Sequence, residues 1–142
     1  MLVTEILKTK GDAVFTIAPD ASLKTAAEQL TSKGVGALVV CESDRVVGVF
    51  SERDLVRAVA EGGEGALDQP VASQMTGQVV FAQPAEGVEI LMSRMTEHRI
   101  RHLPVMRDGR LCGVVSIGDV VKCQIAEASQ EAESLRSYIA AG

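Results

Sequence analysis

The sequence repeats itself at an interval of 65 residues, and this repeat limits the possible fold more than any other feature. The stretch Gly48-Val-Phe-Ser51-Glu-Arg-Asp54 returns as Gly113-Val-Val-Ser116-Ile-Gly-Asp119, with glycine, serine and aspartate at the same spacing. Three further pairs of residues share the interval: Pro19 and Pro84, Leu38 and Leu103, and Val40 and Val105. Several independent landmarks at one fixed period indicate a duplicated structural unit.

Both copies have the pattern of a β-α-β-β-α unit. Apolar residues at helical spacing predict amphipathic helices over Leu23–Leu30 and Val88–Met95. Two short apolar runs joined by a polar turn follow each helix, and a second helix is expected after Ser51 and after Ser116. The expected strands cover Ala13–Ile17, Ala37–Cys41, Val46–Phe50, Val79–Phe81, Leu103–Met106 and Leu111–Val115. The predicted class is α/β (α+β), with a small, mostly antiparallel sheet in each copy and helices on one face of it.

The repeat sets the expected domain organisation. Copy one is predicted to span residues 1–61 and copy two residues 71–123, with a linker at 62–70 around Gly62-Gly-Glu-Gly65 and a C-terminal helix extension at 124–142. A unit of about 65 residues buries too little surface to be stable alone. We therefore expect the two copies to pack with pseudo-twofold symmetry, share one core and form a cleft between them.

The last helix is longer than its counterpart in copy one, and its apolar residues alternate in steps of four and three. They are Val121, Ile125, Ala128, Ala132, Leu135 and Ile139. This spacing is a heptad-like seam. Two interpretations follow from the sequence: the helix packs back on its own module, or it forms a dimer contact.

Composition excludes several classes of protein. The chain has 14 Lys and Arg against 19 Asp and Glu, so a general nucleic-acid binder is unlikely. It has neither an apolar run of membrane-spanning length nor a signal-peptide pattern at its start. Its three cysteines lack the spacing of a zinc site or a disulfide framework, and it shows no recognisable catalytic motif. We expect a soluble, cytoplasmic protein that is not an enzyme and needs no catalytic cofactor.

The repeated Ser-x-x-Asp motif allows two interpretations. Serine at a helix N-cap and an acidic residue three positions later form a capping box, which is a structural device. The same geometry suits a ligand, because free N–H groups at a helix start attract anions and a carboxylate can accept hydrogen bonds from ribose hydroxyls. The two interpretations are compatible.

A basic cluster, Glu97-His-Arg-Ile-Arg101-His102-Leu-Pro104, precedes the first hairpin strand of copy two. It is either a solvated loop or a phosphate clamp in which Arg101 binds two oxygens. His98 and His102 are four residues apart, but Pro104 ends the helix before both could share one face, and no third ligand is evident. We therefore predict no metal site.

At these motifs the chain resembles a tandem CBS-domain pair, or Bateman module. The resemblance rests on the two Gly-h-h-Ser-x-x-Asp stretches (h, apolar) and on Ile100-Arg-His-Leu-Pro-Val105, and it covers about residues 3–123. It implies a stand-alone regulatory sensor that binds AMP, ADP, ATP, NAD(H) or S-adenosylmethionine between the repeats, without catalysis. It also implies a homodimer that regulates an unidentified protein partner.

The resemblance also implies the binding residues. One candidate site combines Ser116, Gly118 and Asp119 with Val14, Phe15, Thr16, Val35, Gly36 and Ala37, and places Arg101 and His102 toward the phosphates; Pro104 is a further candidate for nucleotide binding. The other combines Ser51, Arg53 and Asp54 with Val79, Val80, Ile100 and Arg101. Because the basic residues are distributed unevenly, we expect unequal affinities. The alternative is a ligand-free interaction scaffold whose Ser-x-x-Asp motifs are only helix caps.

Overall fold

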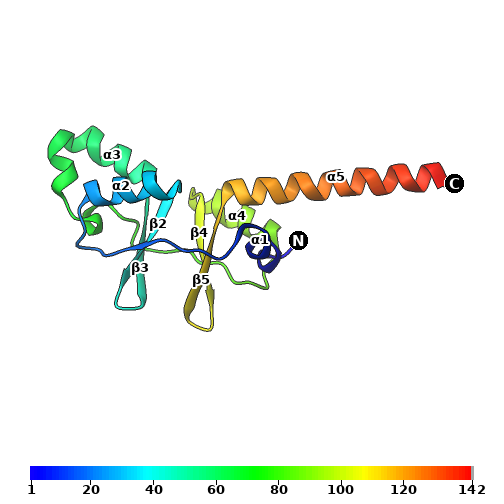
Figure 1. The fold of residues 1–142 in the computed structure, drawn as a ribbon, viewed down its shortest axis with the longest axis horizontal. Helices are drawn as coiled ribbons and strands as arrows, with labels where there is room; N and C mark the ends of the chain where they lie inside the picture. The colour runs from blue at the N-terminus through cyan, green and yellow to red at the C-terminus, as the bar shows by residue number, and fades with distance from the viewer. Residues whose placement is uncertain (142) are drawn as a thin grey trace. The chain divides into compact units, whose positions relative to one another are not determined.

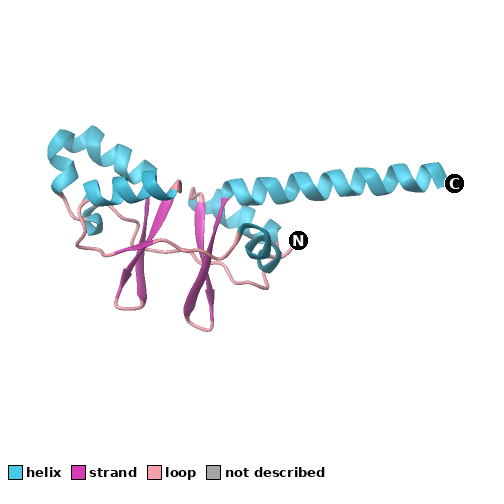
Figure 2. Ribbon diagram, in the orientation of Figure 1, coloured by secondary structure: helices cyan, strands magenta, loops and turns pink. Residues whose placement is uncertain are grey.

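The computed structural model describes residues 1–141, which form two compact units (Figure 1). The central unit is the continuous segment Ala13–Val80, and the terminal unit joins Met1–Asp12 to the chain from Phe81 onward. Each unit contains a small sheet and the helices that cover it (Figure 2). The predicted α/β class is confirmed.

The central unit is built on a sheet with strand order β1-β2-β3. Strand β2 runs parallel to β1 and antiparallel to β3. The elements in chain order are β1 (Thr16–Ile17), α2 (Leu23–Lys33), β2 (Ala37–Glu42), β3 (Arg45–Ser51), α3 (Glu52–Gly62) and two short 3-10 helices, η1 (Gly63–Asp68) and η2 (Val71–Ser73). Every one of these elements contributes side chains to the core, which include Leu23, Leu38, Phe50, Ala58 and Ala66.

Local sequence signals explain how α2 begins and ends. The Ser22 side chain caps the helix by accepting a hydrogen bond from the Thr25 backbone N–H. Gly34 ends it in the left-handed conformation, at a φ of 64°. The following hairpin turns through Ser43 and Asp44, both at positive φ, as a two-residue turn between twisted strands requires.

The terminal unit repeats this architecture with α4 (Val88–His98), β4 (His102–Arg107), β5 (Arg110–Ser116) and α5 (Ile117–Ala141), and adds α1 (Val3–Lys10). Asp108 and Gly109 form the predicted hairpin turn, both at positive φ. Each hairpin also contains a register shift, between Val40 and Cys41 in one and between Val105 and Met106 in the other. The duplication therefore includes this register shift, which the hydrophobic pattern does not predict.

The strand predicted at Val79–Phe81 is wrong, and Pro104 explains why. In the central unit, the Val39 N–H donates to the Phe15 carbonyl and thereby helps to hold β1 beside β2. Pro104 occupies the equivalent position in β4 and has no N–H to donate. Only a single parallel bridge remains, between Ala82 and Val105.

The two units exchange their flanking segments relative to the sequence repeat. The N-terminal helix α1 packs in the second half of the chain, where the Val3 N–H donates to the Glu86 carbonyl at 3.0 Å. The equivalent bond in the central unit runs from the Val71 N–H to the Ala21 carbonyl at 2.8 Å. Each of the two cores is thus completed by the segment that precedes the other core in the sequence. The stretch predicted as a linker contains the 3-10 helix η1, with Ala66 in the core of the central unit.

The glycines of the repeated motif lie where these exchanged segments pack against β3 in the central unit and against β5 in the terminal unit. A Cβ added at Gly48 would lie 2.5 Å from Met75 Sδ and 2.9 Å from the Thr76 carbonyl oxygen. A Cβ at Gly113 would lie 2.7 Å from Leu7 Cδ2. The glycine of the Gly-h-h-Ser-x-x-Asp pattern is therefore a packing requirement of the fold.

Helix α5 runs far past the rest of the terminal unit (Figure 1). Its only buried residues are Val120 and Cys123, and Glu127 pairs with the N-terminal amine of Met1 at 2.6 Å. Residues 128–141 are exposed throughout, so for them the interpretation that the extension packs back on its own module is wrong. Among the described residues, no helix is both long enough and apolar enough for a membrane crossing.

Candidate functional site

The Ser-x-x-Asp motif of the terminal unit forms the start of α5. The Ser116 backbone N–H donates to Asp119 Oδ2 at 2.8 Å, and the Asp119 N–H donates to Ser116 Oγ at 3.2 Å. This reciprocal pair is the capping box that the sequence indicates. It holds the carboxylate at the helix N-terminus, where the positive end of the helix dipole favours negative charge.

A lysine from the other end of the chain completes the surroundings of this carboxylate. Lys10 Nζ donates to Asp119 Oδ2 at 2.7 Å and to the Val114 carbonyl at 2.7 Å. Partial burial, the largest single influence, raises the pKa of Asp119. The hydrogen bonds from Lys10 and from the Ser116 backbone, together with the Lys10 charge, outweigh it, so the pKa of Asp119 lies below its ordinary value. Asp119 is therefore ionised and paired at neutral pH.

The structure brings the basic pair Arg101 and His102 to the same end of the terminal unit. The Ile117 N–H, at the first position of α5, donates to the Arg101 carbonyl at 2.8 Å. His102 begins β4 and lies opposite Ser116 in the strand register. Arg101 is exposed and His102 is half-buried. The backbone of Arg101 and His102 thus lies beside the helix N-terminus that carries Ser116 and Asp119.

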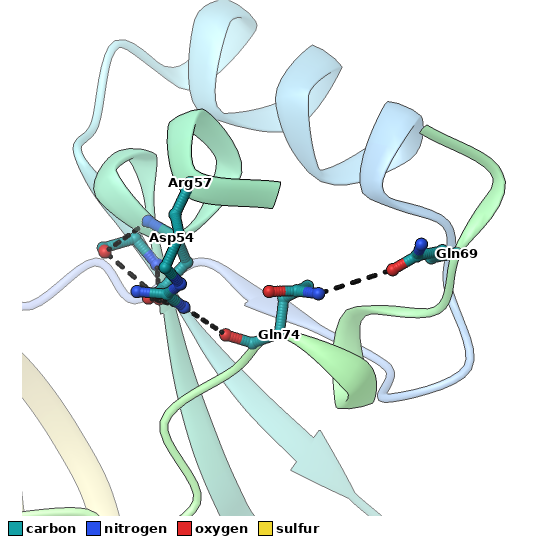
Figure 3. A network of polar contacts seen from close by, with 5 residues as sticks. Asp54, Arg57, Gln69 and Gln74 are labelled. Carbon is teal, nitrogen blue, oxygen red and sulfur yellow. Dashed lines mark hydrogen bonds and ion pairs between the residues drawn. The ribbon is translucent and has the colours of Figure 1, made fainter. Parts of the chain in front are cut away.

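The equivalent motif in the central unit is closed more completely (Figure 3). Asp54 Oδ2 accepts hydrogen bonds from the Ser51 N–H at 2.9 Å and from the Ser51 hydroxyl at 3.1 Å. Its other oxygen, Oδ1, accepts from Arg57 Nη2 at 2.9 Å, and the same nitrogen donates to the Gln74 carbonyl. Asp54 is only 6% exposed. Both oxygens of this carboxylate therefore serve the protein itself.

The two motifs consequently differ in what they leave for a ligand. The described hydrogen bonds of Asp119 converge on Oδ2, whereas those of Asp54 use both oxygens. The Asp119 side chain is 15% exposed and that of Asp54 is 8% exposed. Of the two, Asp119 is the better placed to accept hydrogen bonds from an outside donor.

The strand-entry residues of the central unit line up beside its own Ser-x-x-Asp motif. The Glu52 N–H donates to the Gly36 carbonyl at 3.0 Å, as Ile117 does to Arg101 in the other unit. The Phe15 carbonyl is used by the sheet, and Lys33 Nζ lies 5.3 Å from the centre of the Phe15 ring. Val14 and Ala37 are half-buried, and Thr16 is exposed in β1.

An open cavity of about 530 Å³ lies in the central unit between the end of α2, the entry to β2 and the start of α3. It is lined by Ala27, Leu30, Thr31, Gly34, Val35, Gly36, Glu52 and Leu55. Val35 and Gly36 were expected at a ligand site. The lining does not include Ser51 or Asp54, so this cavity is not built on the carboxylate of the motif.

The remaining predicted residues have varied surroundings. Val79 and Val80 end the central unit and are half-buried outside any strand. Ile100 donates its N–H to the Met95 carbonyl, and the Pro104 carbonyl accepts from Ala82. Arg53 and Gly118 are exposed at their helix starts. The expected pairing of residues from the two copies in one site stays a prediction.

Sequence reasoning missed the two cations that hold the motif carboxylates. Arg57 could have been found, because a basic residue three positions after Asp54 lies on the same helix face. Lys10 could not, since its contact depends on the exchange of the N-terminal segment. Within residues 1–141, no group of three or more His, Cys, Asp or Glu side chains is arranged to hold a metal ion.

Comparisons with known proteins place this geometry in a family. The CBS domain model matches residues 3–61 and 71–126. A mitochondrial CBS domain-containing protein of Arabidopsis thaliana is 32% identical over 99% of this chain and 72% of its own length. A solved CBS-domain protein of Agrobacterium tumefaciens is 45% identical and has a TM-score of 0.85, covering 87% of this chain and 99% of that one.

A third relative was solved with a ligand. It is a CBS domain protein of Pyrobaculum aerophilum complexed with AMP, which is 29% identical with a TM-score of 0.74, covering 84% of this chain and 89% of that one. The duplicated motif, the fold of each unit and the two matched regions agree. The chain therefore belongs to the CBS domain family and carries a tandem pair of CBS domains.

Proposed function

We propose that this chain is a regulatory module that binds an adenosine-containing nucleotide, namely AMP, ADP, ATP or NAD(H), and performs no chemistry on it. The observation that carries the proposal is the environment of Asp119. An ionised carboxylate at a helix N-terminus, with a hydroxyl, a lysine and an arginine nearby, offers partners for both a ribose and a phosphate. The relative complexed with AMP supports the same class of ligand.

In this proposal the residues of the terminal unit divide the ligand between them. Asp119 accepts hydrogen bonds from the ribose hydroxyls through Oδ1, while Oδ2 stays bound to Ser116 and Lys10. Arg101 binds the phosphate, because its planar guanidinium matches two phosphate oxygens. His102, at the start of β4, contacts the phosphate together with Arg101. Backbone and aliphatic groups hold the adenine.

A second function is favoured for the central unit by the contacts of Asp54. Its two oxygens are bound to Ser51 and Arg57, and the carboxylate is nearly buried. These contacts describe a helix cap that stabilises the fold. We therefore propose that the Asp119 motif binds nucleotide with the higher affinity and that the Asp54 motif is chiefly structural.

Isothermal titration calorimetry tests the proposal on protein unfolded and refolded to remove carried ligand. AMP, ADP, ATP and NADH are titrated into the native chain and into Asp119→Asn and Asp54→Asn. Asparagine keeps the size of the side chain but carries no charge. We expect at least one of the four compounds to bind, with an affinity at least about tenfold weaker in Asp119→Asn, because a hydrogen bond to a charged group contributes about 1.5–3 kcal/mol.

The matched variant separates binding from folding. Asp54→Asn should lower the thermal unfolding temperature while leaving nucleotide affinity within about twofold, which is well inside 1 kcal/mol. If none of the four compounds binds the refolded native protein at millimolar concentration, the nucleotide-binding proposal is wrong and the scaffold alternative stands. If Asp54→Asn abolishes binding and Asp119→Asn does not, the assignment of the site is wrong.

A further inference from the structure

The outer part of α5, residues 128–141, is exposed throughout, and the helix has an uncovered apolar face. Within the described chain, the helix runs for 25 residues, and nothing after Cys123 is buried (Figure 1). Four large apolar side chains of one stripe are widely exposed: Val121 at 48%, Ile125 at 62%, Leu135 at 58% and Ile139 at 75%. In proteins, most helical stability comes from the packing of an apolar face rather than from intrinsic helix propensity. The helix therefore needs a surface to cover this face.

The stripe has the spacing of a two-stranded coiled coil. Ile125, Ala132 and Ile139 recur every seven residues, and Val121, Ala128 and Leu135 recur at the same period between them. In heptad terms the first set holds the a positions and the second holds the d positions. In parallel coiled coils, β-branched residues at a with leucine at d favour two strands. Here Ile125 and Ile139 are the β-branched residues at a, and Leu135 is the leucine at d. The two alanines let the helix axes approach closely at the middle of the stripe.

We propose that the α5 helices of two copies of this chain pair in parallel and in register along this stripe. A second copy is the occupant that the charges beside the stripe select. Glu131 lies at a g position and Arg136 lies five residues later at an e position. In a parallel pair each Glu131 faces Arg136 of the other copy, which gives two symmetric ion pairs.

The antiparallel alternative brings like charges together. In that arrangement g positions face g positions and e positions face e positions across the seam. Glu131 would then face its own copy, and Arg136 would face Lys122. Both contacts are repulsive. The charges therefore disfavour the antiparallel pair and favour the parallel pair.

Sedimentation equilibrium of the full chain tests the pairing. Leu135→Asp places a charge in the seam, whereas Ser137→Asp places the same charge at the outward-facing f position two residues later. We expect a concentration-dependent dimer for the native chain and for Ser137→Asp, and a dissociation constant at least about tenfold higher for Leu135→Asp, as burial of an unpaired charge requires. A native chain that is monomeric at about 100 µM, or a dimer that Leu135→Asp leaves unchanged, overturns the proposal.

Charge reversal distinguishes the two orientations by the sign of its effect. Arg136→Glu weakens a parallel dimer by placing two acidic groups together, and Glu131→Arg combined with it restores the affinity. In an antiparallel dimer, Arg136→Glu relieves the repulsion with Lys122 and strengthens association. That result would overturn the parallel arrangement.

Cross-linking reports the register directly. Under mild oxidation Ala132→Cys should form a disulfide-linked dimer, because an a position faces its own copy only in a parallel, in-register pair. Ser137→Cys and the native chain, whose three free cysteines lie outside the stripe, are the controls. Equal cross-linking of Ala132→Cys and Ser137→Cys would contradict the proposed register.

Discussion

Lys10 and Asp119 meet at 2.7 Å, although they lie 109 residues apart in the sequence. The lysine ends α1, and Gly11 at a φ of 94° turns the chain away immediately afterwards. The same ammonium group binds the Val114 carbonyl, so it joins α1 to both β5 and α5. The carboxylate to which we assign the ribose is therefore also the anchor of the N-terminal segment.

Replacing Lys10 should loosen this anchor. Lys10→Met keeps the aliphatic length of the side chain and removes the ammonium, and we expect a loss of about 0.5–1 kcal/mol in the free energy of unfolding, as for a partly exposed ion pair. Lys8→Met is the matched control, because Lys8 is exposed on the same helix. Urea unfolding followed by circular dichroism measures both. An equal effect of the two substitutions would show that the Lys10 contact adds no stability.

The pH dependence of stability should carry the signature of Asp119. Its pKa in the folded protein lies below the ordinary value of 3.8, so the folded state favours the ionised form. The resulting stabilisation is complete above the pKa of the unfolded chain and is lost as the pH falls through the lower, folded pKa. The stability gap between the native chain and Asp119→Asn should thus be constant near neutrality and shrink below about pH 4. Urea titrations across this range measure it, and a gap that widens in acid would contradict the assignment.

The duplicated core could be read from the sequence, but the exchange of flanking segments could not. The 65-residue interval between Ser51 and Ser116 is visible in the sequence itself. The hydrophobic pattern locates α2, α4 and both hairpins. The attachment of Val3 to Glu86 depends instead on where the chain crosses between units, which a local pattern does not encode. The surroundings of Asp119 show the same division: the sequence predicts its capping box with Ser116 but not its contact with Lys10. The absence of the strand before Pro84 could have been predicted, because Pro104 has no N–H to donate to it.

The two motif glycines should differ in their tolerance of alanine. At Gly48 a methyl group would meet the Thr76 backbone oxygen at 2.9 Å as well as Met75, and the backbone cannot move without breaking its pairing with Val49. At Gly113 the obstacle is the end of the Leu7 side chain, which can change rotamer. We expect Gly48→Ala to cost about 2–3 kcal/mol and Gly113→Ala about 1 kcal/mol or less, on the scale of overpacked cores. Thermal unfolding of both variants measures the difference, and the reverse order would refute this view of the packing.

The pair formed by Asp54 and Arg57 should behave as a structural unit. Arg57→Met leaves the buried Asp54 carboxylate with its Ser51 hydrogen bonds alone, and we expect a loss of about 1–2 kcal/mol from the weaker satisfaction of a buried charge. In Asp54→Asn the buried charge is absent, so adding Arg57→Met to that background should cost much less. A double-mutant cycle by urea unfolding measures the coupling. Additive losses would mean that the two side chains do not stabilise each other.

Lys10 should also set the preference of the proposed site for phosphate. The 5′-phosphate of AMP lies next to the ribose, so an ammonium 2.7 Å from the carboxylate to which we assign the ribose is within reach of its charge. Adenosine offers the same ribose without the phosphate. We expect Lys10→Met to weaken AMP binding about tenfold at low salt, the effect of one favourable charge at close range, and to change adenosine binding by no more than about twofold. Calorimetry with both ligands measures the ratio of the two affinities, with Lys8→Met as the control. A parallel loss for AMP and adenosine would place Lys10 in a purely structural role, and tighter adenosine binding in Lys10→Met would show that the lysine competes with the ribose for Asp119.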